Sequence, residues 1–283
     1  MDRILGFAAS LARRIGWAAA TLAVTTTVAW ADRPREWQLG FQDGVTPTFH
    51  QLNELHNWLL VIITLITVFV LGLLVYVCVR FRASRNPVPS KTTHHTWLEV
   101  TWTVVPVLIL VLIAIPSFQL LYYADRAVDP DMTVKVQAHQ WYWSYEYLDQ
   151  QVAFDSNIIP EADLKDGQLR LLEVDNRLVV PVGKKVQVLI TSSDVMHSFF
   201  MPSFGVQLYS TPGRTNETWF QVDKAGVYYG QCNQICGLNH AYMPIVVEAM
   251  EPAAYEAWLV EAKTKFAMDD GAASPRLAAL ASR

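Results

Sequence analysis

Two long runs without a charged residue constrain this chain more than any other feature of its sequence. Trp58–Val79 is 22 residues long and Trp102–Leu121 is 20 residues long. At about 1.5 Å of rise per residue, a helix over either run spans a hydrocarbon core of about 30 Å. Only 17% of the chain is charged, which favours membrane helices over two core helices of a soluble domain. We predict a transmembrane hairpin over residues 56–123, with helices at 58–79 and 102–121.

The charges beside the two runs predict the orientation of the hairpin. The connection between the runs carries Arg80, Arg82, Arg85 and Lys91, whereas three aspartates follow the second run before residue 132. By the positive-inside rule, the connection lies in the cytoplasm and both chain ends lie outside. We therefore expect a multi-pass protein of a bacterial inner (plasma) membrane, with the domain after the hairpin in the periplasm.

Residues 1–31 have the pattern of a secretory signal peptide. Basic residues precede an apolar run that closes on Ala29-Trp30-Ala31, with small residues at the two positions that signal peptidase reads. A retained membrane helix is the alternative, but Ile15–Trp30 is only 16 residues long. We predict cleavage after Ala31, which leaves residues 32–55 as a periplasmic N-terminal segment.

Residues 124–250 change to the period-two pattern of β-strands. Short apolar runs alternate with turn signals such as Asp166-Gly167 and Pro212-Gly213. The strands are expected at Thr133–Val136, Leu169–Val174, Val186–Ile190, Glu217–Val222 and Ile245–Val247. Their spacing predicts an antiparallel sandwich or a small barrel. Residues 251–283 are expected to form a surface helix, from Ala253 to Phe266, and a poorly ordered tail.

The numbers of acidic and basic residues indicate which classes of partner the domain after the hairpin could bind. Between Tyr122 and Met250 the chain holds 15 acidic and nine basic residues, a net charge of −6, while the whole chain carries −4. This balance argues against nucleic acid, because proteins that bind it normally present a basic face. The acidic charge either steers a basic protein toward the domain or only keeps the domain soluble.

The densest group of reactive side chains lies between residues 230 and 244. It contains Cys232, Cys236, His240 and Met243, and His197 lies at the end of an earlier run. Sulfur combined with imidazole selects copper, zinc or an iron–sulfur cluster. Zinc has little use for a methionine, and a mononuclear blue-copper site uses a single cysteine. Two cysteines suit two copper ions bridged by both thiolates, and a disulfide is the plain alternative.

Three other features have a structural and a functional interpretation. The aromatic run Gln140–Tyr147 is either barrel packing or, through an exposed tryptophan, the point at which a docked carrier delivers electrons. Glu99 either complements the dipole of a helix start or forms the mouth of a proton path. Cys78 lies within the first membrane run and is expected to be an inert apolar residue.

Several long motifs, in order along the chain, resemble those of subunit II of cytochrome c oxidase, the haem–copper terminal oxidase. They are Glu99-Val100-x-Trp102-Thr103-x-x-Pro106, His139–Tyr147, Leu169–Arg177, Asp194–Ser198, Pro212-Gly213-Arg214 and Tyr229–Ile245. The resemblance implies a membrane-anchored all-β protein, in which a two-helix transmembrane hairpin precedes a cupredoxin-like Greek-key β-barrel. It also implies that this barrel carries the dinuclear copper centre CuA.

The resemblance implies roles for single residues. The implied copper ligands are His197, Cys232, the backbone carbonyl of Gln234, Cys236, His240 and Met243. Trp141 would receive the electrons, and Glu99 would form the entrance of a proton path into subunit I. The implied acidic docking surface includes Glu146, Asp149 and Asp194.

The implied function is electron input to a membrane oxidase. Electrons from cytochrome c would reach CuA and then a haem in subunit I, where O2 is reduced to water with coupled proton pumping. The implied partners are subunit I, subunit III, cytochrome c and the lipid bilayer. Gln234 stands where the family has a glutamate that also binds magnesium at the interface with subunit I, so weakened magnesium binding is expected. Gln207 and Tyr209 stand where relatives often have Lys and Asp, which alters the region of proton exit.

Other interpretations make different predictions. A quinol-oxidising relative generally lacks the copper ligands, and nitrous oxide reductase needs a large His-rich domain for which this sequence has no counterpart. A membrane-anchored copper chaperone or store would bind one copper per site. A thiol–disulfide oxidoreductase would be colourless and would keep its redox activity without His240.

Overall fold

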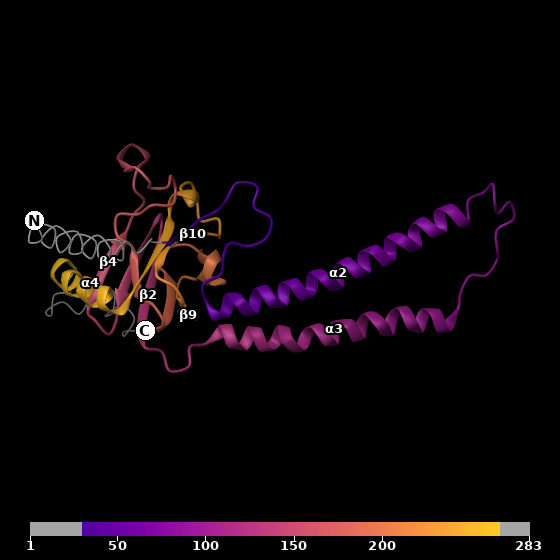
Figure 1. The fold of residues 1–283 in the computed structure, drawn as a ribbon, viewed down its shortest axis with the longest axis horizontal. Coiled ribbons are helices and arrows are strands. Elements are labelled where there is room, and N and C mark those ends of the chain that lie inside the picture. The colour runs from indigo at the N-terminus through magenta and orange to yellow at the C-terminus, as the bar shows by residue number, and fades with distance from the viewer. Residues whose placement is uncertain (1–29, 267–283) are drawn as a thin grey trace, which may run out of the picture.

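A long two-helix hairpin carries a β-domain at one end in the computed structural model, which describes residues 30–266 (Figure 1). The helices are α2 (Pro47–Arg80) and α3 (Thr96–Asp125). Both are long and apolar enough to cross a membrane, and their most apolar windows are not buried against the rest of the described chain. Apolar helices followed by an all-β domain confirm the predicted fold class. Nearly all of the predicted signal peptide and the C-terminal tail lie outside the described residues.

Hydrogen bonds attach both helices to the β-domain. The hydroxyl of Thr46, the N-cap of α2, accepts the backbone N–H of Phe49 and donates to the carbonyl of Phe204 at 2.7 Å. At the end of α3, the indole of Trp219 donates to the carbonyl of Tyr123 at 2.9 Å. Because α2 begins about three turns before the charge-free run, its first part lies between the β-domain and the predicted membrane.

Two sheets pack around one core. The first has the order β5–β11–β10–β7–β8, formed by Leu178–Pro181, Pro244–Met250, Gly226–Cys232, His197–Met201 and Val206–Ser210, and β1 (Trp30–Asp32) also pairs with β10. The second has the order β4–β3–β2–β6–β9, formed by Val152–Ser156, Tyr142–Tyr147, Met132–His139, Lys185–Ser192 and Asn216–Gln221. Alternate residues of β6 are buried, as expected for a strand with one face on the core.

The sheets differ from the prediction in the direction of some strands. The pairs β2–β6, β5–β11 and β1–β10 are parallel, whereas an antiparallel domain was expected. Parallel neighbours cannot be joined by a tight hairpin. The chain therefore leaves the second sheet after β4, forms β5 at the edge of the first sheet and returns as β6.

The predicted strand at Leu169–Val174 is wrong. This segment is mostly turn, Leu171 adopts a left-handed φ of 63°, and Val174 forms only an isolated bridge to Ile158. Leu169 and Leu172 instead pack on a small apolar cluster that includes Val174. The apolar side chains of this segment are therefore buried by packing over the sheet, although its backbone does not form a strand of the sheet.

A buried ion group joins this segment to the first sheet. Glu173, only 1% exposed, accepts hydrogen bonds from Nε and Nη2 of Arg177 at 3.1 and 3.0 Å. Arg177 also pairs with Glu248 of β11 at 3.1 Å. Because the carboxylate of Glu173 is removed from water, Arg177 supplies the charge that its burial requires.

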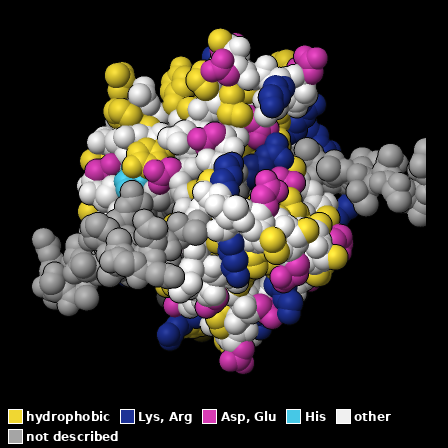
Figure 2. Space-filling view, turned by 90° about the vertical axis from the view of Figure 1, so that its left-hand side faces the viewer, with side chains coloured by type: hydrophobic (Ala, Val, Ile, Leu, Met, Phe, Trp, Pro, Cys, Tyr) yellow, Lys and Arg dark blue, Asp and Glu magenta, His cyan; other side chains and the backbone are white. Residues whose placement is uncertain are grey.

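The remaining elements cover the ends of the β-domain. Helix α4 (Pro252–Lys265) buries Tyr255, Leu259 and Ala262 in the main core. Three short 3-10 turns are η1 (Glu161–Asp163), η2 (Pro202–Phe204) and η3 (His240–Tyr242). On the face that points away from the hairpin, acidic and basic side chains are intermixed with apolar ones (Figure 2).

Candidate metal centre

The side chains of the predicted copper ligands meet at one end of the first sheet. His197 opens β7 and Cys232 closes β10, and these two strands are neighbours. Cys236 lies in the loop after β10, His240 in η3, and Met243 directly before β11. The loop between β10 and β11 therefore folds back over the end of β7.

The two thiols form the middle of the group. The Sγ atoms of Cys232 and Cys236 lie 3.9 Å apart and both thiols are free, whereas a disulfide requires about 2.05 Å. These sulfurs and a ring nitrogen of His197 lie within 4.8 Å of one another, so the three side chains could hold a metal ion. The backbone carbonyl of Gln234 lies 3.3 Å from Sγ of Cys232.

Both imidazoles turn their Nδ1 atom toward sulfur. Nδ1 of His197 lies 3.3 Å from Sδ of Met243 and 3.9 Å from Sγ of Cys232. Nδ1 of His240 lies 3.5 Å from Sγ of Cys236. Each thiol thus has one imidazole beside it, which is the arrangement that two metal ions between two thiolates would need.

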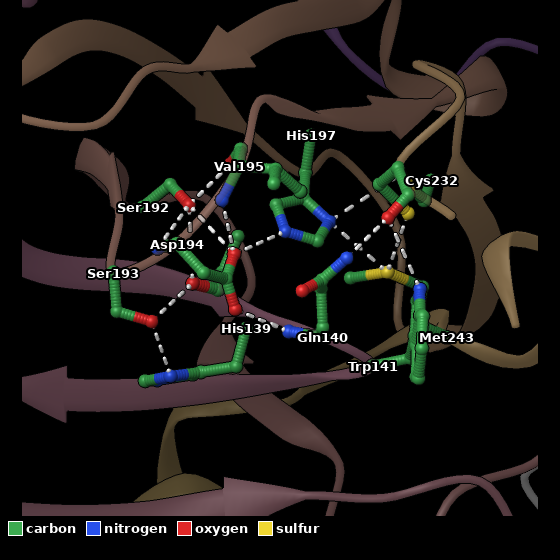
Figure 3. Close-up of polar contacts among 12 residues, drawn as sticks. His139, Gln140, Trp141, Ser192, Ser193, Asp194, Val195, His197, Cys232 and Met243 are labelled. Carbon is green, nitrogen blue, oxygen red and sulfur yellow. Dashed lines mark hydrogen bonds and ion pairs between the residues drawn. The ribbon is translucent and has the colours of Figure 1, made fainter. Parts of the chain in front are cut away.

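Asp194 sets the orientation of His197 (Figure 3). Nε2 of His197 lies 2.8 Å from Oδ1 of Asp194, and donation of the Nε2 proton to this carboxylate leaves Nδ1 unprotonated whenever the ring is neutral. The carboxylate of Asp194 accepts the backbone N–H groups of Gln140 and Val195, both at 2.6 Å. A carboxylate that fixes the far nitrogen of an imidazole in this way is typical of metal-binding histidines.

The environment affects the two thiols differently. Burial disfavours the thiolate of Cys232, but hydrogen bonds with His197 and with the backbone hold the pKa of Cys232 below its usual value. Burial, and then the neighbouring charge of Cys232, raise the pKa of Cys236. One thiolate is therefore favoured in the metal-free site, and the second forms when a cation compensates its charge.

Side chains before and within β3 hold the ligand loop. The carbonyl of Cys236 accepts hydrogen bonds from the side-chain amide of Gln140 at 2.7 Å and from the indole of Trp141 at 3.3 Å. The indole of Trp143 donates to the carbonyl of Met243 at 3.1 Å. The second sheet thus fixes the backbone on both sides of the loop.

Sequence reasoning missed Gln140 and Trp143 as supports of the site, and it assigned Asp194 to docking alone. The signal for both residues was their place in the aromatic run Gln140–Tyr147, which lies at the start of β3 beside the ligand loop. For Asp194 the signal was its position three residues before His197.

The three predicted docking acids do not form one patch. Asp149 accepts the backbone N–H of Thr133 at the start of β2, roughly 20 Å from the end that leads to the metal centre. Glu146 pairs with Lys135 at 3.3 Å, and only 13% of its side chain is exposed. Asp194 alone lies at the metal centre, where it contacts His197.

Glu99 lies at the far end of the hairpin, in the first turn of α3. Its carboxylate accepts the backbone N–H of His95 at 3.2 Å, while the ring of His95 accepts the backbone N–H of Leu98. This reciprocal capping stabilises the helix start. About 39 Å of helix separates Glu99 from Asp125, at the end of α3 beside the β-domain.

The chain matches two families over most of its length. These are "Cytochrome C oxidase subunit II, periplasmic domain" over residues 132–250 and "Cytochrome C oxidase subunit II, transmembrane domain" over residues 34–120. The probable cytochrome c oxidase subunit 2 of Rickettsia bellii (strain RML369-C) is 47% identical over 247 residues, which cover 87% of this chain and 91% of the relative.

Two further similar proteins extend this comparison. Cytochrome c oxidase subunit 2 of Oenothera berteroana is 50% identical over 240 residues, covering 82% of this chain and 93% of the relative. The crystal structure of the periplasmic domain of subunit II of cytochrome oxidase (CoxB) of Bradyrhizobium japonicum is 45% identical, with a TM-score of 0.47, over 50% of this chain and 100% of that one. The family matches and the identities to the curated relatives establish that this chain belongs to the cytochrome c oxidase subunit II family of haem–copper terminal oxidases.

Proposed function

We propose that this chain receives electrons from cytochrome c and delivers them to subunit I of its oxidase, with its ligand cluster holding a pair of copper ions. The ligands would be His197, Cys232, the carbonyl of Gln234, Cys236, His240 and Met243. The observation that carries the proposal is the pair of free thiols 3.9 Å apart, each with an imidazole Nδ1 beside it. When bound by these residues, a copper pair would supply a one-electron carrier.

The chemistry of the donors fits copper. Thiolate, imidazole and thioether are the soft and intermediate donors that copper prefers, and Met243 is a ligand that zinc seldom uses. Met243 is buried, with Sδ 3.6 Å from Sγ of Cys236, so the thioether belongs to the cluster and not to the solvent. A disulfide-exchange site would have no use for this third sulfur.

The protein's own residues prepare the site for electron transfer by limiting its movement. Asp194 fixes the ring of His197, Gln140 holds the peptide of Cys236, and Trp143 holds that of Met243. A ligand set restrained by such neighbours changes little in geometry when its charge changes. Small rearrangement is the property that a fast electron carrier needs.

Trp141 is the residue we propose for electron input. Its partly exposed ring donates a hydrogen bond to the carbonyl of Cys236, so a surface aromatic group contacts the peptide of a ligand directly. Gly237 makes this contact feasible. A Cβ at Gly237 would lie 2.9 Å from the ring of Trp141, and its φ of 125° favours glycine.

The surface around the ligand cluster suits a protein partner whose contact surface has apolar side chains surrounded by basic ones. Ile235 and Leu238 of the ligand loop are among the most exposed apolar residues of the β-domain. The net charge of −6 between Tyr122 and Met250 would steer a basic cytochrome c toward this surface. Because Glu146 is engaged internally, we expect the overall charge to matter more to docking than Glu146.

The orientation of the hairpin follows from the same proposal. The β-domain would lie in the periplasm and the basic connection in the cytoplasm, where Glu99 would open a proton path into subunit I. Subunit I would reduce O2 to water with coupled proton pumping, and subunit III would be a further partner in the complex. Gln234 lacks the carboxylate that would bind magnesium at the interface with subunit I, so we propose weakened magnesium binding there.

Metal analysis combined with electron paramagnetic resonance of the assembled oxidase tests the proposal. We expect two coppers per chain in the β-domain, sharing one unpaired electron. Cys232→Ser should abolish this signal, while the matched control Cys78→Ser, in α2, should keep it. One copper per chain would favour a chaperone or store, and an S–S bond in the metal-replete enzyme would contradict the ligand assignment.

A further inference from the structure

The segment before α2 exposes large apolar side chains. Trp37 is 94% exposed, Leu39 is 97% exposed and Phe41 is 46% exposed. We call residues 35–43 the N-terminal loop. In Figure 1 this segment extends from the β-domain toward the hairpin and lies beside the first turns of α2.

The N-terminal loop has a defined conformation that keeps these side chains outward. An ion pair between Arg35 and Asp43 closes its base. The side chain of Gln38 accepts the backbone N–H of Arg35 at 3.1 Å and donates to the carbonyl of Phe41 at 2.6 Å. Trp37 adopts a φ of 56°, a left-handed conformation that is rare for a bulky residue. The loop therefore presents Trp37 and Leu39 and does not fold them back onto the β-domain.

Ring contacts of Phe41 with α2 place this part of the N-terminal loop at a defined position along the helix. The ring centroid of Phe41 lies 4.6 Å from that of His56 and 6.0 Å from that of Phe49. His56 precedes Trp58, the first residue of the charge-free run, by two positions. Phe41, two positions after Leu39, therefore lies close to the point where α2 enters the predicted hydrocarbon region.

We propose that the N-terminal loop inserts Trp37 and Leu39 into the interfacial layer of the membrane, on the side of the β-domain, as an anchor additional to the hairpin. Tryptophan is enriched at this layer because its ring is apolar and its N–H is polar. Residues 32–43 carry two arginines against Asp32, Glu36 and Asp43, so they have no excess of basic charge that would require an anionic lipid, and a zwitterionic lipid surface suffices. The proposal goes beyond electron transfer and requires only that α2 crosses a membrane.

Photocrosslinking in the assembled oxidase tests the proposal. The photoreactive residue p-benzoylphenylalanine replaces Trp37, Leu39 or, as a matched control, Val260, which is 70% exposed on α4. The probe is a nanodisc of phosphatidylcholine with alkyne-tagged acyl chains. We expect lipid adducts at residues 37 and 39 at least tenfold above residue 260. Adducts to another oxidase subunit, or a lipid yield equal to the control, would overturn the proposal.

A second measurement uses a milder change. The fluorescence difference between the parent oxidase and Trp37→Phe isolates the emission of Trp37, and the copper signal verifies that both are folded. Phosphatidylcholine brominated near the headgroup should quench this difference at least twofold more than lipid brominated near the bilayer centre. Absence of quenching by either lipid, or stronger quenching from the centre, would contradict an interfacial position.

Discussion

Asp194→Asn replaces one carboxylate oxygen by an NH2 group. The effect of this change follows from the contacts of the carboxylate. Oδ1 accepts from Nε2 of His197 and from the backbone of Val195, and Oδ2 accepts the backbone N–H of Gln140. An asparagine has one acceptor oxygen, so its NH2 group must face one of these donors. If the NH2 group faces the backbone N–H of Gln140, two hydrogen-bond donors point at each other. Facing His197, it moves the ring proton to Nδ1, the nitrogen that points at the sulfurs.

The magnitude follows from the role of such partners in metal sites. Removing the group that orients a metal-binding imidazole costs roughly 10- to 100-fold in metal affinity. That corresponds to about 1.4 to 2.8 kcal/mol. Burial raises the pKa of Asp194, but the hydrogen bonds from His197, Val195 and Gln140 together outweigh burial and keep the pKa below its usual value. The carboxylate is therefore ionised at neutral pH, and the substitution also removes its charge.

Copper competition against a chelator, on the full-length chain, measures the effect. Asp149→Asn is the matched control, because that carboxylate accepts a backbone N–H at the other end of β2 and should leave the affinity unchanged. Thermal unfolding of the metal-free variants separates folding from binding. Parental copper affinity in Asp194→Asn, or an equal loss in both variants, would refute the reasoning.

Three further predictions concern the fold, the thiols and the interface. Arg177→Met leaves the buried carboxylate of Glu173 unpaired and should lower the free energy of unfolding by about 3 to 5 kcal/mol in urea titrations, with Glu173→Gln restoring part of the loss. Because the pKa of Cys236 is raised, copper binding must release its proton, so the apparent affinity should fall by up to about tenfold per unit as pH decreases; a pH-independent affinity would argue against a protonated thiol. Gln234→Glu should bind manganese more tightly than the parent oxidase in resonance titrations, and equal affinities would count against the proposed magnesium effect.

The parts of the fold set by long-range composition could be predicted from sequence. A charge-free run longer than a bilayer core has few other solutions, so Trp58–Val79 and Trp102–Leu121 indicated the hairpin directly. The ligand cluster was also predictable, because Cys232 to Met243 lie within 12 consecutive residues, from the last residue of β10 through the loop before β11. Only His197 comes from elsewhere, and its strand is the neighbour of β10.

Features that depend on tertiary contacts could not be predicted. The apolar segment Leu169–Val174 has strand composition, but its side chains cap the sheet and its backbone turns. Glu146 looks like a surface acid in the sequence, yet Lys135 on the facing strand engages it. The orienting role of Asp194 depends on a backbone N–H of Gln140, 54 positions earlier in the chain.

The cap at Thr46 and the indole bond from Trp219 attach the β-domain to both helices of the hairpin. The helical stretch between Thr46 and Trp58 therefore sets how far the β-domain lies from the charge-free run and which side of α2 the domain faces. Inserting one residue there would turn the start of α2 by about 100° and shift it by about 1.5 Å relative to α3, so the β-domain could keep its contact with only one of the two helices. The number of residues in this stretch is therefore matched to the contacts that the β-domain makes with both helices at once.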